Sequence, residues 1–214
     1  MSISEELRRT VDHVRSVAPP PVFSKLESAI AALHGDGIAD RGVAVGDHPK
    51  LPVLNGVDGR PVDLAALNAA GPLVITFYRG GWCPYCNVEL RGLQRIDAEL
   101  RQHGAFQVAV TPEVPSHGAT TAAEAGVTFP VLHDAGLAFA RALGIVFEPT
   151  GELREAHQAF GLDLQARNQA DTDELPLAVT LVLDRDGKVV WAFKDADWTK
   201  RAEPSDILSA VVGQ

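Results

Sequence analysis

The sequence has few cysteines and no surplus of positive charge, and both shortages narrow what the protein can do. Among 214 residues there are two cysteines, and 19 lysines and arginines stand against 28 aspartates and glutamates, which gives a formal net charge of −9. A chain this acidic, without a cluster of basic residues, matches neither nucleic acid nor an anionic membrane surface. We therefore predict neither of them as a partner.

Long apolar runs are also missing. No stretch of the sequence is long enough to span a bilayer. The start, Met-Ser-Ile-Ser-Glu-Glu, lacks the basic region followed by an apolar region that is typical of a signal peptide. The expected location is the reducing cytoplasm, where an isolated cysteine pair indicates catalysis rather than a structural disulfide.

Both cysteines lie in one Trp-Cys-Pro-Tyr-Cys motif at 82–86, directly after an apolar stretch at 72–78 that predicts a buried strand. Pro84 favours a helix start there, because its missing N–H costs nothing in the first turn. A Cys-x-x-Cys at a strand-to-helix junction is typical of redox sites, since the positive end of the helix favours a thiolate at the first sulfur. The second sulfur, one turn further on, can close a disulfide with it.

Two inert core cysteines or half of a zinc site are the alternatives to a redox pair. Zinc needs two more ligands, and the sequence offers no second cysteine pair and no histidine pair at metal spacing. The histidines are scattered at positions 13, 34, 48, 103, 117, 133 and 157. We therefore predict a redox-active pair, Cys83 and Cys86, and no bound metal.

Residues 1–41 predict a helical hairpin. Ser2 and Glu5 have the spacing of a capping box, and apolar residues recur at steps of four and three over 3–17. Three prolines at 19–21 end that helix, and a second apolar stripe over 23–33 stops near two glycines. The apolar face of this hairpin must be buried. We expect it to pack on the rest of the chain, with a second subunit of a homodimer as the alternative surface.

From residue 42 to 214 the pattern alternates between strands and helices. Strands are expected at 51–54, 61–62, 73–77, 106–110, 129–132, 177–183 and 189–193. Helices are expected at 64–68, 84–103, 120–125, 137–143, 152–160 and from 204 onward, with a polar loop at 163–174. This order predicts a single α/β domain with a mixed central sheet, preceded by the helical extension.

The stretch from Phe77 to Cys86 resembles the active-site turn of thioredoxin-fold proteins, and its Cys-Pro-Tyr-Cys tetrad is similar to that of glutaredoxins. Over 42–211 the chain resembles peroxiredoxins of the AhpC/TSA family, in the branch that carries a Cys-x-x-Cys. The matching pieces, in the family's order, are 46–54, 59–64, 108–113, 122–134 and 181–187. The resemblance implies a thioredoxin-like three-layer α/β sandwich, and the N-terminal hairpin lies outside it.

The register of this resemblance leaves the identity of the attacking sulfur open. Counted from the strand end, the peroxide-attacking cysteine of the family falls at Cys86, and the threonine that orients the peroxide falls at Cys83. The geometry of the helix favours the opposite assignment, with Cys83 exposed at the N-cap with the lower pKa and Cys86 more buried. We expect Cys83 to meet a protein disulfide first, whereas for peroxide both assignments stand.

The catalytic arginine of peroxiredoxins aligns near Ala178, so the chain departs from the family there. Arg79, in the cysteine loop, is the candidate replacement. Trp82 resembles the tryptophan that shields the thiol in thioredoxins, and Tyr85 lies between the two cysteines. Thr180 lies where thioredoxins and glutaredoxins have a proline that faces the disulfide.

The charged segment at 195–204 is interpreted mainly as a solvated loop that leads into the last helix. Under the minority alternative, Trp198 or Arg201 reaches the cysteines.

The resemblance implies a thiol-dependent, antioxidant peroxidase that reduces hydrogen peroxide or organic hydroperoxides through Cys83 and Cys86. A thioredoxin- or glutaredoxin-type protein would be the reductant, and no metal, flavin or haem is implied. Two other functions stay open. The first is a thiol–disulfide oxidoreductase without peroxidase activity, favoured by the tetrad and the missing arginine. The second is a non-enzymatic redox sensor.

Overall fold

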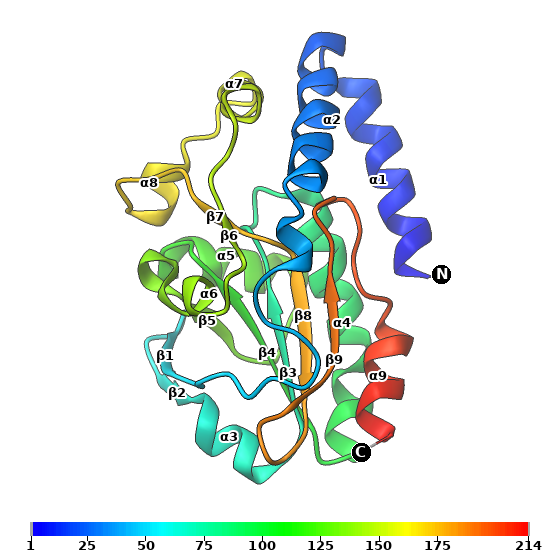
Figure 1. Cartoon of the computed structure of the whole chain (residues 1–214), viewed down its shortest axis with the longest axis vertical. Coiled ribbons are helices and arrows are strands. Elements are labelled where there is room, and N and C mark those ends of the chain that lie inside the picture. The colour runs from blue at the N-terminus through cyan, green and yellow to red at the C-terminus, as the bar shows by residue number, and fades with distance from the viewer. Residues whose placement is uncertain (1, 214) are drawn as a thin grey trace.

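The computed structural model describes residues 2–213 and is built on a mixed seven-stranded sheet (Figure 1). Its strands are β1 (Val53–Gly56), β2 (Pro61–Asp63), β3 (Leu73–Phe77), β4 (Phe106–Thr111), β5 (Val131–His133), β8 (Val179–Leu183) and β9 (Val189–Lys194). They lie in the order β2-β1-β5-β4-β3-β8-β9. The three strands β5, β4 and β3 are parallel to their neighbours in that group, whereas β1–β2, β1–β5, β3–β8 and β8–β9 are antiparallel pairs. The mixed sheet that the sequence predicts is therefore confirmed.

Helices flank this sheet and complete the α/β sandwich. They are α1 (Ile3–Val17), α2 (Pro20–Gly35), α3 (Leu64–Ala70), α4 (Pro84–Gln102), α5 (Pro115–Ala125), α6 (Ala138–Ala142), α7 (Gly151–Ala159), α8 (Leu164–Asn168) and α9 (Pro204–Val212). Helix α4 lies against β4 and contacts both α5 and α9. Among the described helices, none is both long and apolar enough to cross a membrane.

The centre of the sheet explains why the cysteine motif is held rigidly. All residues of β3 and β8 are buried, which suits strands covered on both faces and accounts for their continuous apolar sequence. Thr76 and Thr180 face each other across the two strands, and their hydroxyls are 3.1 Å apart. Because β3 leads directly into the cysteine loop, that loop starts from a fully buried strand.

The N-terminal hairpin packs on the rest of the same chain, as the sequence predicts. Helix α1 lies along α4, and α2 contacts α7 (Figure 1). The Ser2 hydroxyl caps α1 by accepting a hydrogen bond from the amide of Glu5 at 3.2 Å. The carboxylate of Glu203 accepts the amides of Ile3 and Ser4, so the start of the hairpin is tied to the start of α9.

The expectation of a plain loop over 163–174 was wrong. Asp163 caps the short helix α8 by accepting the amide of Ala166 at 3.0 Å, and Leu164 is buried. Just beyond it, β7 (Leu175–Pro176) pairs with β6 (Val146–Phe147) in a separate two-stranded sheet. Elements of two to five residues are too short to show a hydrophobic period, so tertiary contacts decide them.

Candidate redox site

The two cysteines lie where β3 passes into α4, as predicted. Cys83 is the N-cap of α4, and its carbonyl accepts the amides of Cys86 and Asn87. Both side chains are completely buried, with an exposed fraction of 0%. The expectation that Cys83 would be exposed was wrong. Its sulfur contacts a neighbouring arginine, and a loop from the C-terminal part of the chain packs on that arginine.

That arginine is Arg79, whose Nη2 donates a hydrogen bond to Cys83 Sγ at 3.0 Å. Two indole rings hold its guanidinium, because Cζ lies 5.0 Å from the ring centroid of Trp82 and 4.9 Å from that of Trp198. Such cation–π contacts are stronger when the cation is desolvated, and Arg79 is 3% exposed. The structure thus places Arg79, which the sequence singled out only for its nearness, directly on the first sulfur.

A second arginine holds the other sulfur. Arg201 Nη2 donates to Cys86 Sγ at 3.2 Å, and Arg201 Nε donates to Glu89 Oε2 at 2.6 Å. Arg201 and Glu89 are both buried. The remaining donor, Nη1, binds the backbone carbonyls of Trp198 and Lys200. The interpretation of this segment as mainly solvated was therefore wrong for its two largest side chains, since Trp198 is also buried.

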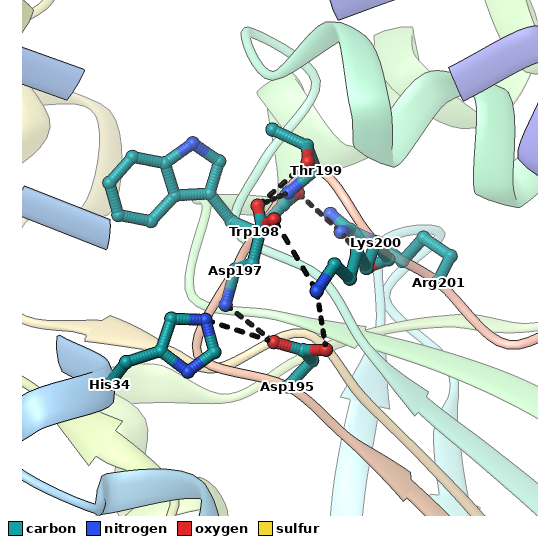
Figure 2. Close-up of polar contacts among 7 residues, drawn as sticks. All are labelled: His34, Asp195, Asp197, Trp198, Thr199, Lys200 and Arg201. Carbon is teal, nitrogen blue, oxygen red and sulfur yellow. Dashed lines mark hydrogen bonds and ion pairs between the residues drawn. The ribbon is translucent and has the colours of Figure 1, made fainter. Parts of the chain in front are cut away.

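The loop at 195–201 organises itself through its own aspartates (Figure 2). Asp195 Oδ1 accepts the amide of Asp197 at 2.8 Å and lies 3.6 Å from Nε2 of His34 on α2. Lys200 Nζ lies 3.6 Å from the other oxygen of Asp195. These contacts tie the loop to the N-terminal hairpin.

Asp197 closes the second turn of the same loop. Its Oδ1 accepts both the amide and the hydroxyl of Thr199, at 2.9 Å and 2.7 Å. Figure 2 shows Trp198 and Arg201 pointing away from this aspartate cluster in different directions. The loop therefore contributes to both arginine–sulfur contacts. Trp198 packs on Arg79, the arginine that contacts Cys83, and Arg201 itself contacts Cys86.

The surroundings of the two thiols shift their pKa values in opposite directions. Burial raises the pKa of Cys83, but the hydrogen bond with Cys86 and the charges of Arg79 and Arg201 outweigh it, so the pKa lies well below its usual value. Burial also raises the pKa of Cys86, and the neighbouring Cys83 adds to that effect, so the pKa of Cys86 lies well above its usual value. The geometry therefore favours a thiolate at Cys83 and a thiol at Cys86.

Two further ionisable groups are buried beside the sulfurs. Burial raises the pKa of Glu89 to about 7, although Arg201 opposes that shift. Burial and then the charge of Arg79 lower the pKa of His157 to about 3, so the imidazole is neutral at ordinary pH. Its ring meets the Trp82 ring edge-on, with the centroids 5.4 Å apart.

The other site residues expected from the sequence differ in how close they lie to the two sulfurs. Trp82 is half-buried between Arg79 and His157. Tyr85 is buried, and this burial, followed by the charge of Cys83, raises the pKa of its phenol to about 12. Thr180 lies in the sheet, where its hydroxyl pairs with Thr76 rather than with a sulfur.

The backbone between β3 and α4 is held by a buried carboxylate. Glu113 Oε2 accepts the amide of Gly81 at 2.8 Å, and Arg167 Nη1 donates to Oε1 at 3.1 Å. Gly80 has φ +147, and a Cβ there would lie 2.4 Å from Nε1 of Trp82. Only glycine fits this backbone, because the conformation and the close indole both exclude a side chain.

Metal ligation has no geometric support in the part of the chain that the structure describes. Across residues 2–213, no three or more histidine, cysteine, aspartate or glutamate side chains are grouped so as to hold an ion.

Comparison with known proteins places this site in a family. The pattern of the AhpC/TSA family matches residues 45–192, which is well over half of the chain. The chain belongs to the AhpC/TSA family. The match includes both cysteines, Arg79 and Glu89, but it excludes the N-terminal hairpin and the loop that carries Arg201.

The similar proteins carry two kinds of description, thiol–disulfide oxidoreductase and peroxiredoxin. The thiol–disulfide oxidoreductase ResA of Halalkalibacterium halodurans is 29% identical over 121 residues, which cover 56% of this chain and 68% of that protein. Among solved structures, the peroxidoxin BcpB of Mycobacterium tuberculosis has a TM-score of 0.61 at 20% identity, covering 79% of this chain and 96% of that one. Peroxiredoxin Q of Xanthomonas campestris has a TM-score of 0.58 at 22% identity, covering 78% and 96%. These structural likenesses establish the thioredoxin-like, peroxiredoxin-like fold, and the family makes the protein an oxidoreductase.

Glu89 and Arg201 are the site residues that sequence reasoning missed or undervalued. Glu89 had a signal, because it lies one turn beyond Cys86 on the apolar face of α4, where a carboxylate needs a partner. Arg201 had none in the spacing of the sequence, since it lies 115 residues from Cys86 and reaches it only through the folded loop.

Proposed function

We propose that this AhpC/TSA protein is a thiol-dependent peroxidase that reduces hydrogen peroxide or organic hydroperoxides. One observation carries the proposal: a buried thiol, Cys83, accepts a hydrogen bond from a buried guanidinium, Arg79, at 3.0 Å. A cation in this position favours the thiolate, which is the nucleophile. The same cation can donate to a peroxide oxygen and stabilise the charge that develops as the O–O bond breaks.

The proposed reaction assigns the first attack to Cys83. Its thiolate attacks one peroxide oxygen, the O–O bond breaks, and the second oxygen leaves with a proton as water or an alcohol. Cys83 is then a sulfenic acid. The Cys86 thiol attacks that sulfur, water leaves, and the Cys83–Cys86 disulfide forms. The sulfur is oxidised by two electrons and the peroxide is reduced by two.

Arg201 and Glu89 support the second step in this scheme. Cys86 must lose its proton as it attacks the sulfenic acid, and Arg201 contacts the sulfur on which negative charge then develops. Glu89 contacts that guanidinium, and because its pKa is about 7 it can exchange a proton near neutral pH. Two thiols of a thioredoxin- or glutaredoxin-type reductant would then reopen the disulfide by exchange, and a reducing cytoplasm is the compartment in which such reductants work.

Single-turnover oxidation of the reduced protein by hydrogen peroxide tests the proposal. We expect oxidation much faster than that of free cysteine, with loss of two thiols and no disulfide-linked dimer. Cys86→Ser should consume one equivalent of peroxide and stop at a sulfenic acid that dimedone traps, whereas Cys83→Ser should not react. If Cys86→Ser is instead the unreactive variant, the peroxiredoxin register is correct and the order of attack is reversed. Oxidation of the wild type at the rate of free cysteine would eliminate the peroxidase.

A thiol–disulfide oxidoreductase without peroxidase activity is the second candidate, because the similar ResA protein carries that description. The complete burial of both sulfurs does not separate the two candidates, since the protein reductant of the peroxidase must reach the same sulfurs as a protein disulfide. Reduction of insulin by the reduced protein separates the two. Rapid insulin reduction together with slow peroxide oxidation would replace the first proposal with this one, and neither activity would leave the redox sensor.

A further inference from the structure

The AhpC/TSA match leaves out both the N-terminal hairpin and the 195–201 loop. The loop contributes to the redox site, because Arg201 contacts Cys86 and Trp198 packs on Arg79. The hairpin contacts this loop at both of its ends. Two segments outside the family match are therefore joined to each other beside the cysteines.

The start of the loop is held by the end of the hairpin. Nζ of Lys194, the last residue of β9, donates a hydrogen bond to the carbonyl of Arg41 at 3.0 Å. One residue later, Asp195 Oδ1 lies 3.6 Å from Nε2 of His34, and Figure 2 shows the imidazole beside this carboxylate. The chain therefore leaves the sheet toward the redox site with two contacts to the hairpin.

The other end of the loop is held by the start of the hairpin. The carboxylate of Glu203 accepts the amide of Ile3 at 3.1 Å through one oxygen and that of Ser4 at 2.7 Å through the other. N–H groups in the first turn of a helix have no partner within the helix, and a negative charge is favourable there. Glu203 lies two residues beyond Arg201, so one carboxylate joins the start of α1 to the segment that carries this arginine.

Between these two ends, the hairpin and the loop are not closely packed. A cavity of about 270 Å³ has walls from both, and its lining includes Val11, Phe23 and Ile30 from the hairpin and Trp198 and Thr199 from the loop. A cavity of this size reduces the van der Waals contact between its walls. The polar contacts at the two ends therefore make a large part of the attachment.

Arg201 follows the position of the loop, because its guanidinium is bound to the backbone of the loop itself. Nη1 donates to the carbonyls of Trp198 and Lys200. The other donors reach out of the loop, Nε to Glu89 and Nη2 to Cys86. A displacement of the loop would therefore take the guanidinium away from the sulfur.

We propose that the N-terminal hairpin positions Arg201 at Cys86, with Glu203 as the residue that connects them. Glu203 is a positioning residue in this inference, since its carboxylate binds the hairpin and it acts on the sulfur only through Arg201.

The inference rests on the proposed peroxidase function, in which Cys86 attacks the sulfenic acid of Cys83. Arg201 stabilises the negative charge that develops on Cys86 in this step, so a displaced loop should slow the closure of the disulfide. Formation of the sulfenic acid should change less, because Arg79 belongs to the cysteine loop and also packs on Trp82.

The lifetime of the sulfenic acid after a single turnover with hydrogen peroxide tests this inference. In Glu203→Ala, the sulfenic acid that dimedone traps should persist roughly tenfold longer than in the wild type, which is the effect of weakening a hydrogen bond to a charged group. Glu203→Gln keeps one acceptor oxygen for one of the two amides and should give an intermediate lifetime. His34→Leu loosens the other end of the loop and should lengthen the lifetime less, because Lys200 also contacts Asp195.

Glu6→Ala is the matched control. The carboxylate of Glu6 also attaches α1, but to Arg95 of α4, with a 3.0 Å contact. This variant loosens the hairpin from α4 rather than from the loop and should keep the wild-type lifetime. Equal lifetimes in Glu203→Ala and Glu6→Ala would overturn the inference and leave the peroxidase intact.

The NMR resonance of the Nε–H of Arg201 gives a readout that needs no peroxide. This proton is buried and bound to Glu89, so it should exchange slowly with water, and Arg201→Lys, which lacks the group, assigns it. The slow exchange should persist in Glu6→Ala and be lost in Glu203→Ala. That result supports the positioning of Arg201 even if no peroxide reacts, in which case the peroxidase proposal alone fails. Slow exchange that persists in Glu203→Ala overturns the inference.

Discussion

Nη2 of Arg79 lies 3.0 Å from the sulfur of Cys83, which is four residues further along the chain and is the N-cap of α4. The indoles of Trp82 and Trp198 both pack on the guanidinium and help to hold it in this position. Burial raises the pKa of a thiol, and the charge of Arg79 is, after the hydrogen bond with Cys86, the next contribution that lowers the pKa of Cys83.

Arg79→Met should therefore raise the pKa of Cys83 and slow its reactions. In the wild type the pKa lies well below its usual value, so alkylation by iodoacetamide should vary little between about pH 7 and about pH 9. In the variant the rate should rise with pH over this range, since the thiolate fraction then increases with pH. The ultraviolet absorbance of the thiolate, followed against pH, measures the same shift directly.

Arg91→Met removes the same charge from an exposed position of α4 and is the matched control. It should leave the alkylation profile of the wild type unchanged. If Arg79→Met also keeps the flat profile, the helix end and Arg201 are sufficient to hold the thiolate, and Arg79 has no part in activating it.

The buried pair of Arg201 and Glu89 should contribute strongly to the folded state. Arg201→Met leaves Glu89 buried without its cationic partner, so that this side chain must take up a proton, and it removes a donor from Cys86; we expect a loss of about 3–5 kcal/mol in the free energy of unfolding. Replacing both members, in Glu89→Gln/Arg201→Met, removes the group that would have to take up a proton and should restore part of the stability. Urea unfolding of the reduced proteins measures both effects.

The pair Arg95–Glu6, with a 3.0 Å contact between an exposed arginine and a half-buried glutamate, supplies the comparison. Arg95→Met should cost less than about 1 kcal/mol, because such pairs are solvated before and after folding. A loss for Arg201→Met as small as that for Arg95→Met would show that water reaches Glu89, and the pair would then not belong to a closed site.

Gly81 is a packing requirement of the cysteine loop. A Cβ at this position would lie 1.9 Å from Oγ1 of Thr121 on α5, so Gly81→Ala must push the loop away from that helix. We expect a loss of about 1–3 kcal/mol in stability from overpacking, together with slower oxidation of Cys83 by peroxide because Arg79 moves with the loop. Gly35→Ala, where nothing lies within 4 Å of the added methyl group, should change neither quantity. Unchanged oxidation in Gly81→Ala would mean that the loop tolerates displacement.

The parts of this fold that could be predicted from the sequence are those with local causes. The apolar run of β3, Pro84 at the start of α4 and the stripe of α1 each depend on neighbouring residues, and each element appears where it was expected. The fold class followed from the order of such elements and from the family resemblance.

The parts that could not be predicted depend on residues far apart in the sequence. Arg201 looked like one charge in a solvated run, because nothing near it in the chain indicates that Asp195 and Asp197 turn the loop inward. Arg79, which contacts the sulfur of Cys83, likewise packs on Trp198, and these two residues meet only in the folded chain. The local sequence predicted the position of Cys83 at the helix start but not its complete burial.

His157 should make the protein sensitive to acid. Burial holds the pKa of this histidine at about 3 in the folded state, whereas the unfolded chain takes up the proton near the ordinary value of 6.5. Between these values the unfolded state binds more protons, so the free energy of unfolding falls as the pH is lowered from 6.5 toward 3. The contribution of this one group approaches about 1.4 kcal/mol per pH unit within that window.

His157→Phe tests this sensitivity, because it keeps an aromatic ring against Trp82 and removes the proton site. Between about pH 7 and about pH 5 the variant should lose less stability in urea unfolding than the wild type, by on the order of 1–2 kcal/mol. His13→Phe, at an exposed position of α1, shows what the loss of a surface histidine does by itself. If His157→Phe and the wild type lose stability in parallel, the imidazole takes up its proton in the folded protein as readily as in the unfolded chain. Water would then reach His157, and this side chain would not shield Trp82 and Arg79 from solvent.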